Sequence, residues 1–217
     1  MKLNKEALKR AVMKRWAAVL LALALVLAVL PGCAKDAVSS ATVGIDALPA
    51  VEKHPDAAAL VVYFSTDDTV RAVAYTIADT LGADVFEIVP EEPYTEADLR
   101  YYTDCRADRE QQDSTARPAI SAWPESLAQY RVIFLGYPIW HGQAPRILYT
   151  LLEGVDVSGK TVVPFCTSAS SGAGSSASNL EKITAGAVWL KARRIDNRST
   201  AEQIRTWALA ALKETAK

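Results

Sequence analysis

Residues Val61 to Ala74 read VVYFSTDDTVRAVA, and this stretch predicts the fold of most of the chain. Starting at Leu60, an unbroken apolar run extends to Phe64, which is typical of a strand buried on both faces of a parallel sheet. A polar loop follows at 65–69, and apolar residues then recur at helical spacing, at Val70, Val73, Ile77 and Leu81. A strand, a short polar loop and a helix start form a corner suited to phosphate, because free N–H groups and the positive helix end face the loop.

The chain after this corner keeps alternating between buried strands and amphipathic helices. Gly82 is a stop signal for the first helix. The apolar pattern predicts strands at 83–89, 130–136, 160–166 and 187–190. It predicts helices at 146–153 and 177–183, and a closing helix from Ser199 with Glu202 completing a capping box. Strands that alternate with helices indicate an α/β fold, in which helices cover both faces of a parallel sheet.

A long polar section at 90–125 separates the second predicted strand from the third. A connection of this length inside a compact domain is usually functional. It holds one short helix candidate at 95–101, with Thr95 as the N-cap and Asp98 three residues later. The charged residues of 104–112 favour a solvated surface.

Three loops at the carboxyl ends of predicted strands have an unusual composition. The first is the polar loop 65–69. The second, 136–145, is rich in aromatic residues, glycine and proline, and the third, 166–176, is rich in serine, glycine and alanine. In open α/β sheets, ligands bind at this edge, near the switch point in strand order. We therefore expect the three loops to converge on one pocket.

The amino-terminal segment 1–33 predicts an export signal. Residues 1–15 carry six basic side chains and one acidic side chain, and residues 16–30 are wholly apolar. This apolar run is short for a membrane span but suits the central region of a secretory signal peptide. It ends in Leu30-Pro-Gly-Cys33, which resembles a bacterial lipobox, so we expect a lipid on Cys33. An uncleaved signal anchor is the alternative, and either one places the protein on the extracytoplasmic side of the membrane.

The rest of the chain divides into a tether and one domain. Residues 34–57 are small and polar, lack helical or strand periodicity and contain two prolines, so we interpret them as a flexible tether. The remaining 58–217 is long enough for one domain with a full core. The chain has 24 Lys and Arg against 25 Asp and Glu, with no basic stripe, which argues against nucleic acid as a partner.

Cysteine and histidine usage argues against a metal centre. The chain has two histidines, His54 and His141, and no CxxC pair. Besides the predicted lipid attachment site, Cys105 and Cys166 form one disulfide or none. The apolar run before Cys166 favours a packed core cysteine over a redox thiol. A GxSxG elbow is missing from the sequence, which argues against a serine hydrolase.

Several stretches together resemble the flavodoxin-like proteins, and specifically a bacterial branch that often carries lipoprotein signals. The matching stretches are LVVYFS, PYTEADL, ARPAI, VIFLGYPIWHGQAP, SGKTVVPFCTS and SSGAGSS, which run from about Leu60 to Ile195. The resemblance implies a flavodoxin-like three-layer sandwich, with a five-stranded parallel sheet in the order 2-1-3-4-5 and helices on both faces. It also implies noncovalent FMN that serves electron transfer.

The second and third loops supply what a flavin ring needs, an apolar stacking surface and closely approaching backbone. Trp140, with Tyr137 beside it, can provide the surface, and small residues from Thr167 to Gly174 let the backbone approach a planar ring. The alternatives are that Trp140 packs against the following helix and that His141 is an ordinary exposed histidine. We assign no catalytic residue and no metal ligand. The residues expected to bind the cofactor are Ser65, Thr66, Asp68, Thr69, Pro138, Ile139, Trp140, His141, Gly142, Thr167, Ser168, Ser171, Gly172 and Gly174.

The first loop departs from the pattern that the resemblance implies, which is Ser/Thr-x-Thr-Gly-x-Thr around the phosphate. Ser65 matches the first hydroxyl position, but Asp67 stands in place of a threonine and Asp68 in place of the glycine. Thr66 and Thr69 remain as donors. A carboxylate repels a phosphate dianion, by roughly 1 kcal/mol per unit-charge pair at about 4 Å in water-like surroundings.

Two functions therefore remain open. The first is an FMN-binding electron-transfer protein or small FMN-dependent reductase, anchored outside the cytoplasmic membrane and serving an unidentified redox partner protein. The second is a cofactor-free binding module of flavodoxin-like fold that has lost phosphate recognition. Asp67 and Asp68 favour the second function, whereas the aromatic loop and the third loop favour the first.

Overall fold

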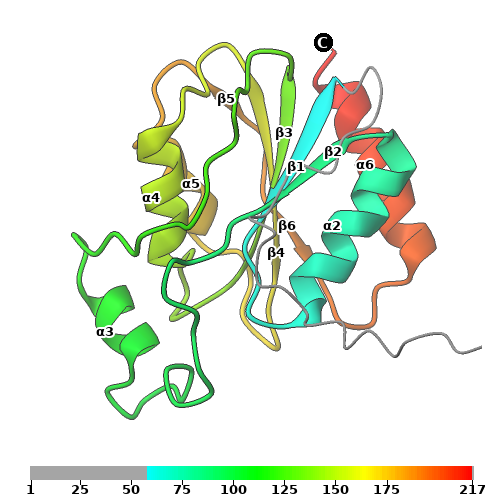
Figure 1. Cartoon of the computed structure of the whole chain (residues 1–217). Helices are drawn as coiled ribbons and strands as arrows, with labels where there is room; N and C mark the ends of the chain where they lie inside the picture. The colour runs from blue at the N-terminus through cyan, green and yellow to red at the C-terminus, as the bar shows by residue number, and fades with distance from the viewer. Residues whose placement is uncertain (1–57, 217) are drawn as a thin grey trace, which may run out of the picture. The chain divides into compact units, whose positions relative to one another are not determined.

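The computed structural model of the protein describes residues 58–216 (Figure 1). The predicted signal segment 1–33, the lipid site Cys33 and the tether 34–57 lie outside the described residues. Among the helices of 58–216, none combines the length and the apolar character that a membrane crossing needs.

A parallel sheet in the order β2-β1-β3-β4-β5 forms the centre of the domain, and the predicted order is confirmed. Its main strands are β1 (Ala59–Tyr63), β2 (Asp84–Glu87), β3 (Val132–Pro138), β4 (Thr161–Thr167) and β5 (Val188–Trp189). An unpredicted short strand, β6 (Arg193–Ile195), also pairs with β4. β5 pairs with the amino end of β4 and β6 with its carboxyl end, so two short strands share the edge position.

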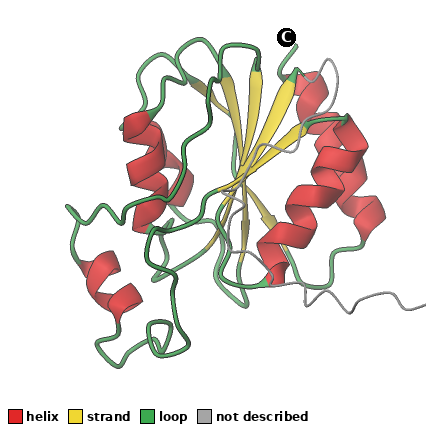
Figure 2. Cartoon of the chain, viewed as in Figure 1, coloured by secondary structure: helices red, strands yellow, loops and turns green. Residues whose placement is uncertain are grey.

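Helices cover both faces of the sheet, as the three-layer prediction requires (Figure 2). One face carries α2 (Asp68–Leu81) and α6 (Ala201–Glu214), and the other carries α4 (Arg146–Gly154) and α5 (Ser176–Glu181). All five residues of β1 are buried, and alternate residues enter the two cores. Leu60 packs with the α4 side, whereas Val61 packs with the apolar stripe of α2. Gly82 ends α2 with a positive φ of 57°, as its stop signal predicts.

The predicted helix at 95–101 is wrong, because this segment forms turns. The cap contacts do form, since the Thr95 hydroxyl donates to the Asp98 carboxylate at 2.7 Å, but no helix grows from them. The helix of this section is α3 (Arg106–Gln112), within the stretch that we predicted to be a solvated surface. Asp108 is buried, so the prediction of a solvated surface fails there, whereas Asp104 and Arg109 are exposed as predicted. The uncharged Gln111 of α3 is buried as well.

The closing helix begins one residue later than predicted. Its capping box joins Thr200 and Gln203, and Ala201 is the first helical residue. Ser199 instead accepts a hydrogen bond from the backbone N–H of Asp196 at 3.1 Å, in the turn before the helix. The box therefore has the predicted chemistry with a shifted register.

Cys105 and Cys166 are both buried, and neither forms a disulfide. Cys166 has no exposed surface, and its burial raises the pKa of the thiol to about 11, against a smaller lowering by Arg194. The interpretation of Cys166 as a packed core cysteine is therefore confirmed. Within 58–216, no cluster of His, Cys, Asp and Glu side chains has the arrangement of a metal site.

Candidate functional site

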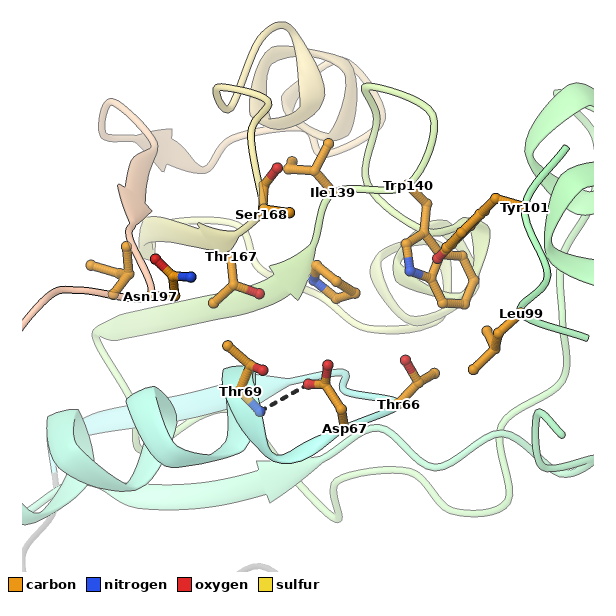
Figure 3. Close-up of a pocket in the computed structure, with 13 residues that line it drawn as sticks. Thr66, Asp67, Thr69, Leu99, Tyr101, Ile139, Trp140, Thr167, Ser168 and Asn197 are labelled. Atoms are coloured by element: carbon orange, nitrogen blue, oxygen red, sulfur yellow. Dashed lines mark hydrogen bonds between the residues drawn. The ribbon is translucent and has the colours of Figure 1, made fainter. Parts of the chain in front are cut away.

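The carboxyl ends of β1, β3 and β4 border one cavity of about 500 Å³ (Figure 3). The three unusual loops of the sequence all contribute to its lining. Their contributions are joined by two side chains from the connection after β2 and two from the segment that follows β5. The lining residues are Thr66, Asp67, Thr69, Leu99, Tyr101, Pro138, Ile139, Trp140, Thr167, Ser168, Ala169, Ile195 and Asn197.

Half of the predicted cofactor contacts lie on this cavity. Those that line it are Thr66, Thr69, Pro138, Ile139, Trp140, Thr167 and Ser168. Those that lie outside its lining are Ser65, Asp68, His141, Gly142, Ser171, Gly172 and Gly174. Gly174 lines a neighbouring cavity between α5 and the β5–β6 edge. The Ser65 hydroxyl is turned back on its own loop and donates to the backbone oxygen of Asp67.

The sequence missed the lining residues that come from outside the three loops. Leu99 and Tyr101 belong to the long connection at 90–125, whose length and whose matching stretch PYTEADL indicated a role without pointing to either residue. Ile195 is the last residue of β6 and Asn197 lies two residues beyond it. Because β6 runs parallel to β4, both residues lie at the same edge of the sheet. The strand was overlooked, so its carboxyl end could not be recognised as part of the site.

Of the two aspartates in the first loop, only Asp67 faces the cavity. Asp67 is the N-cap of α2, and its carboxylate accepts a hydrogen bond from the Thr69 N–H at 2.8 Å (Figure 3). This carboxylate therefore already occupies one of the free N–H groups with which a helix start binds an anion. The Asp68 side chain is 92% exposed and accepts from Arg71 at 3.0 Å, so it does not border the cavity.

Arg71, the cation nearest to this loop in sequence, is engaged by two carboxylates. It donates to Asp68 at 3.0 Å and to Glu87 at 2.8 Å. The hydrogen bond to Glu87, followed by one to Tyr63, raises the pKa of Arg71 further above its usual value. A phosphate in the first loop would thus be repelled by the Asp67 carboxylate, while the positive charge of Arg71 is already balanced by Asp68 and Glu87.

Trp140 forms the aromatic part of the cavity wall. It is only 3% exposed, and its ring meets Phe64, Tyr94 and Tyr101 edge-on, with centroid distances of 5.5, 5.2 and 6.2 Å. Trp140 therefore both packs against these three rings and lines the cavity. Tyr137 does not share the wall, because it is fully buried and its hydroxyl lies 3.1 Å from the Ser176 hydroxyl.

The cavity has an aromatic end and an opposite end where polar and aliphatic residues mix. Figure 3 shows Trp140 and Tyr101 close together at one end, whereas Thr167, Ser168 and Asn197 lie at the other. Tyr101 is 37% exposed, and partial burial is the main reason that its pKa is raised. The volume lies within the range of about 300–1,000 Å³ that is usual for small-molecule sites. The cavity can therefore hold a flat ring system at one end and a hydroxylated chain towards the other.

Comparison with known proteins identifies the family of the chain. A family model described as flavodoxin matches residues 58–211. The solved structure of a candidate flavoprotein from Bacteroides eggerthii is 40% identical over 73% of this chain and 98% of its own, with a TM-score of 0.66. A second candidate flavoprotein, from Bacteroides uniformis, is 37% identical over 70% and 97%, with a TM-score of 0.66.

A more distant structure carries a cofactor. It is a flavoprotein from Lactobacillus acidophilus in complex with FMN, 20% identical over 73% of this chain and 98% of its own, with a TM-score of 0.56. At this identity the likeness concerns the fold. No curated protein gives a significant match to the chain.

Proposed function

We propose that this chain, which belongs to the flavodoxin family, binds FMN in the cavity at the sheet edge and transfers electrons on the extracytoplasmic side of a bacterial membrane. The observation that carries the proposal is the cavity itself, which joins an aromatic pair to polar loops at the carboxyl ends of β1, β3 and β4. The relatives named flavoproteins, which share 37–40% identity with the chain, support the same cofactor class.

The residues fit the ring of FMN better than its phosphate. Trp140 and Tyr101 would hold the ring and keep water from one end of it, and the Thr66 and Thr69 hydroxyls would serve the phosphate. When bound, FMN supplies the capacity to take up and release one or two electrons. Asp67 opposes the phosphate end, so we expect binding that depends on the ring more than is usual for FMN sites.

Titration with FMN tests the cofactor. We expect the purified protein to bind one FMN per chain and to quench the fluorescence of the flavin, because the ring lies against Trp140 and Tyr101. Isothermal calorimetry on the same samples gives the affinity. A protein that binds neither FMN nor riboflavin would instead be a cofactor-free binding module, the function that Asp67 favours.

We propose further that a lipid on Cys33 anchors the domain to the membrane. The support is the sequence alone, a basic start followed by an apolar run that ends at Cys33. The tether at 34–57 would let the domain reach an unidentified redox partner protein, or a small substrate if the protein is a reductase.

Fractionation of cells tests the anchor. The wild-type protein is expected in the membrane fraction and to incorporate labelled fatty acid, and Cys33→Ala is expected to lose the label. Cys105→Ala is the matched control, because this cysteine is buried in the folded domain and should leave the label in place. Wild-type protein recovered from the cytoplasm with its amino terminus intact would contradict the anchor.

A further inference from the structure

α3 has a buried polar face that points at the aromatic loop after β3. Figure 1 shows this short helix below α4 and apart from the sheet. Its buried residues are Ala107, Asp108 and Gln111, so two of the three are polar. Buried polar side chains cost free energy unless they are hydrogen-bonded, which makes their partners informative.

Both the amide nitrogen and the amide oxygen of the Gln111 side chain form hydrogen bonds with the backbone of that loop. Its amide nitrogen donates to the carbonyl oxygens of Trp140 at 3.1 Å and Ala144 at 3.2 Å, and its amide oxygen accepts from the Arg146 N–H at 3.0 Å. The Arg146 guanidinium returns to the helix and donates to the Gln111 carbonyl at 3.1 Å. One side chain thus joins both ends of the loop 140–146.

Asp108, one turn earlier on α3, holds the same loop through His141. The His141 imidazole donates to its carboxylate at 2.7 Å, and Asp108 is only 1% exposed. Burial acts to raise the pKa of Asp108, but hydrogen bonds from His141, Thr103 and Cys105 outweigh it and leave the pKa below its usual value. Asp108 is therefore a charged partner, and its other oxygen accepts from the Thr103 N–H at 3.0 Å.

The backbone around this contact is unusual. In the described part of the chain, the residues other than glycine with a positive φ are Tyr102, Asp104 and His141, at 66°, 56° and 47°. Asp and His adopt such conformations more readily than most residues with a side chain, whereas Tyr102 needs surrounding contacts to hold it there. The Tyr101 and Tyr102 rings both lie against the His141 ring, with centroid distances of 5.5 and 5.4 Å.

We propose that α3 is a clamp on the loop 140–146, and that Asp108 and Gln111 are positioning residues that set the place of Trp140 in the cavity wall. Gln111 fixes the backbone at both ends of the loop, and Asp108 fixes His141 next to Trp140. The Tyr101 ring packs against both Trp140 and His141. By holding His141, α3 therefore also sets how the Trp140 and Tyr101 rings lie relative to each other. The part of the inference that concerns the flavin rests on the proposed function.

The test compares Gln111→Glu with Gln112→Glu. The first change keeps the size of the side chain but replaces the two donated hydrogen bonds with a carboxylate facing two carbonyl oxygens. The second makes the same chemical change one residue later, on an exposed position of the same helix. Hydrogen exchange of peptides covering 139–146 is measured first, without flavin. Exchange in Gln111→Glu is expected to be faster by about tenfold or more, and unchanged in Gln112→Glu.

Flavin binding provides the second measurement. In Gln111→Glu, FMN and riboflavin are expected to bind more weakly by a similar factor, about tenfold, because both rings use the same wall. The midpoint potential and visible spectrum of the bound flavin, measured at saturation, are expected to shift in Gln111→Glu and to remain unchanged in Gln112→Glu.

Unchanged exchange in folded Gln111→Glu overturns the clamp, and faster exchange with unchanged flavin affinity and potential overturns the positioning role. If Gln111→Glu does not fold, His141→Ala decides by the same measurements, since alanine cannot make the hydrogen bond to Asp108 and the His141 side chain is partly exposed. Wild-type protein that takes up no flavin refutes the proposed function, while the exchange comparison still decides whether α3 holds the loop.

Discussion

Trp140→Ala is expected to lower the free energy of unfolding by about 3–5 kcal/mol, the usual range for removal of a buried Trp or Phe side chain. The residue is 3% exposed and belongs to the core cluster on the α4 side of the sheet. Its ring is met edge-on by Phe64, Tyr94 and Tyr101, so alanine would leave a cavity that three aromatic rings border. Phe64 and Tyr94 are held by contacts with each other and, for Tyr94, with Glu110 and Arg106, so the space cannot close fully.

Chemical denaturation of Trp140→Ala without flavin measures this loss. The matched control is Trp123→Ala, because Trp123 is 46% exposed and does not line the cavity. We expect a clearly smaller loss for Trp123, since nearly half of its surface is already in water. A loss for Trp140→Ala well below about 3 kcal/mol would show that the aromatic cluster around Trp140 contributes less to stability than its burial implies.

Flavin affinity of the folded fraction of Trp140→Ala gives a second readout. We expect weaker binding by about 1–3 kcal/mol, the contribution of a lost aromatic contact. FMN and riboflavin should lose affinity equally, because the change affects the ring and not the phosphate. An unaltered affinity would show that Trp140 supports the wall without contacting the flavin.

Apolar periodicity predicted the elements whose buried residues are apolar. α2 was expected from Val70, Val73 and Ile77, all of which are buried. The order of the main strands was implied by the resemblance to the flavodoxin-like proteins and not by periodicity. α3 was missed because its buried face carries Asp108 and Gln111, whose partners lie in a loop about thirty residues away. No local pattern can indicate a polar face that is satisfied by tertiary contacts.

The site was predictable to the extent that its residues follow strands. Thr66, Trp140 and Thr167 stand at or just after the ends of strands β1, β3 and β4, so their positions on the cavity follow from the parallel sheet. Tyr101 reaches the cavity from a turn segment of the connection after β2, and only tertiary contacts set its place. β6 was missed because two of its three residues are arginines, which do not read as a buried strand.

The direction of side chains in the first loop was also beyond the sequence. Asp67 and Asp68 are neighbouring aspartates with the same side chain, and both were expected to oppose a phosphate. In the structure the helix geometry separates them, because the N-cap side chain turns back to the Thr69 N–H while the first helical residue points to Arg71. The residue that limits phosphate binding is therefore Asp67, and an experiment on Asp68 alone would address the wrong carboxylate.

Asp67→Ser is expected to raise the affinity for FMN and to leave the affinity for riboflavin nearly unchanged. Serine is a good N-cap, so the start of α2 should remain intact. The substitution removes one negative charge from the cavity lining, next to the helix start that would receive the phosphate. The expected gain for FMN is on the order of 1 kcal/mol in water-like surroundings, and up to about 4 kcal/mol at an effective dielectric of 20.

The ratio of FMN affinity to riboflavin affinity is the quantity to measure, at low and at high salt. Asp68→Ser is the matched control, because it makes the same change on a side chain that is 92% exposed and paired with Arg71. We expect the ratio to rise in Asp67→Ser well above its value in Asp68→Ser, and high salt to narrow the difference, since exposed charges are screened. A wild-type protein that already prefers FMN by several orders of magnitude would mean that the Asp67 carboxylate leaves the Thr69 N–H when FMN binds. The two variants separate the ring end of the site from its phosphate end. Trp140→Ala is expected to lower the affinities for FMN and riboflavin alike, whereas Asp67→Ser is expected to raise the affinity for FMN alone.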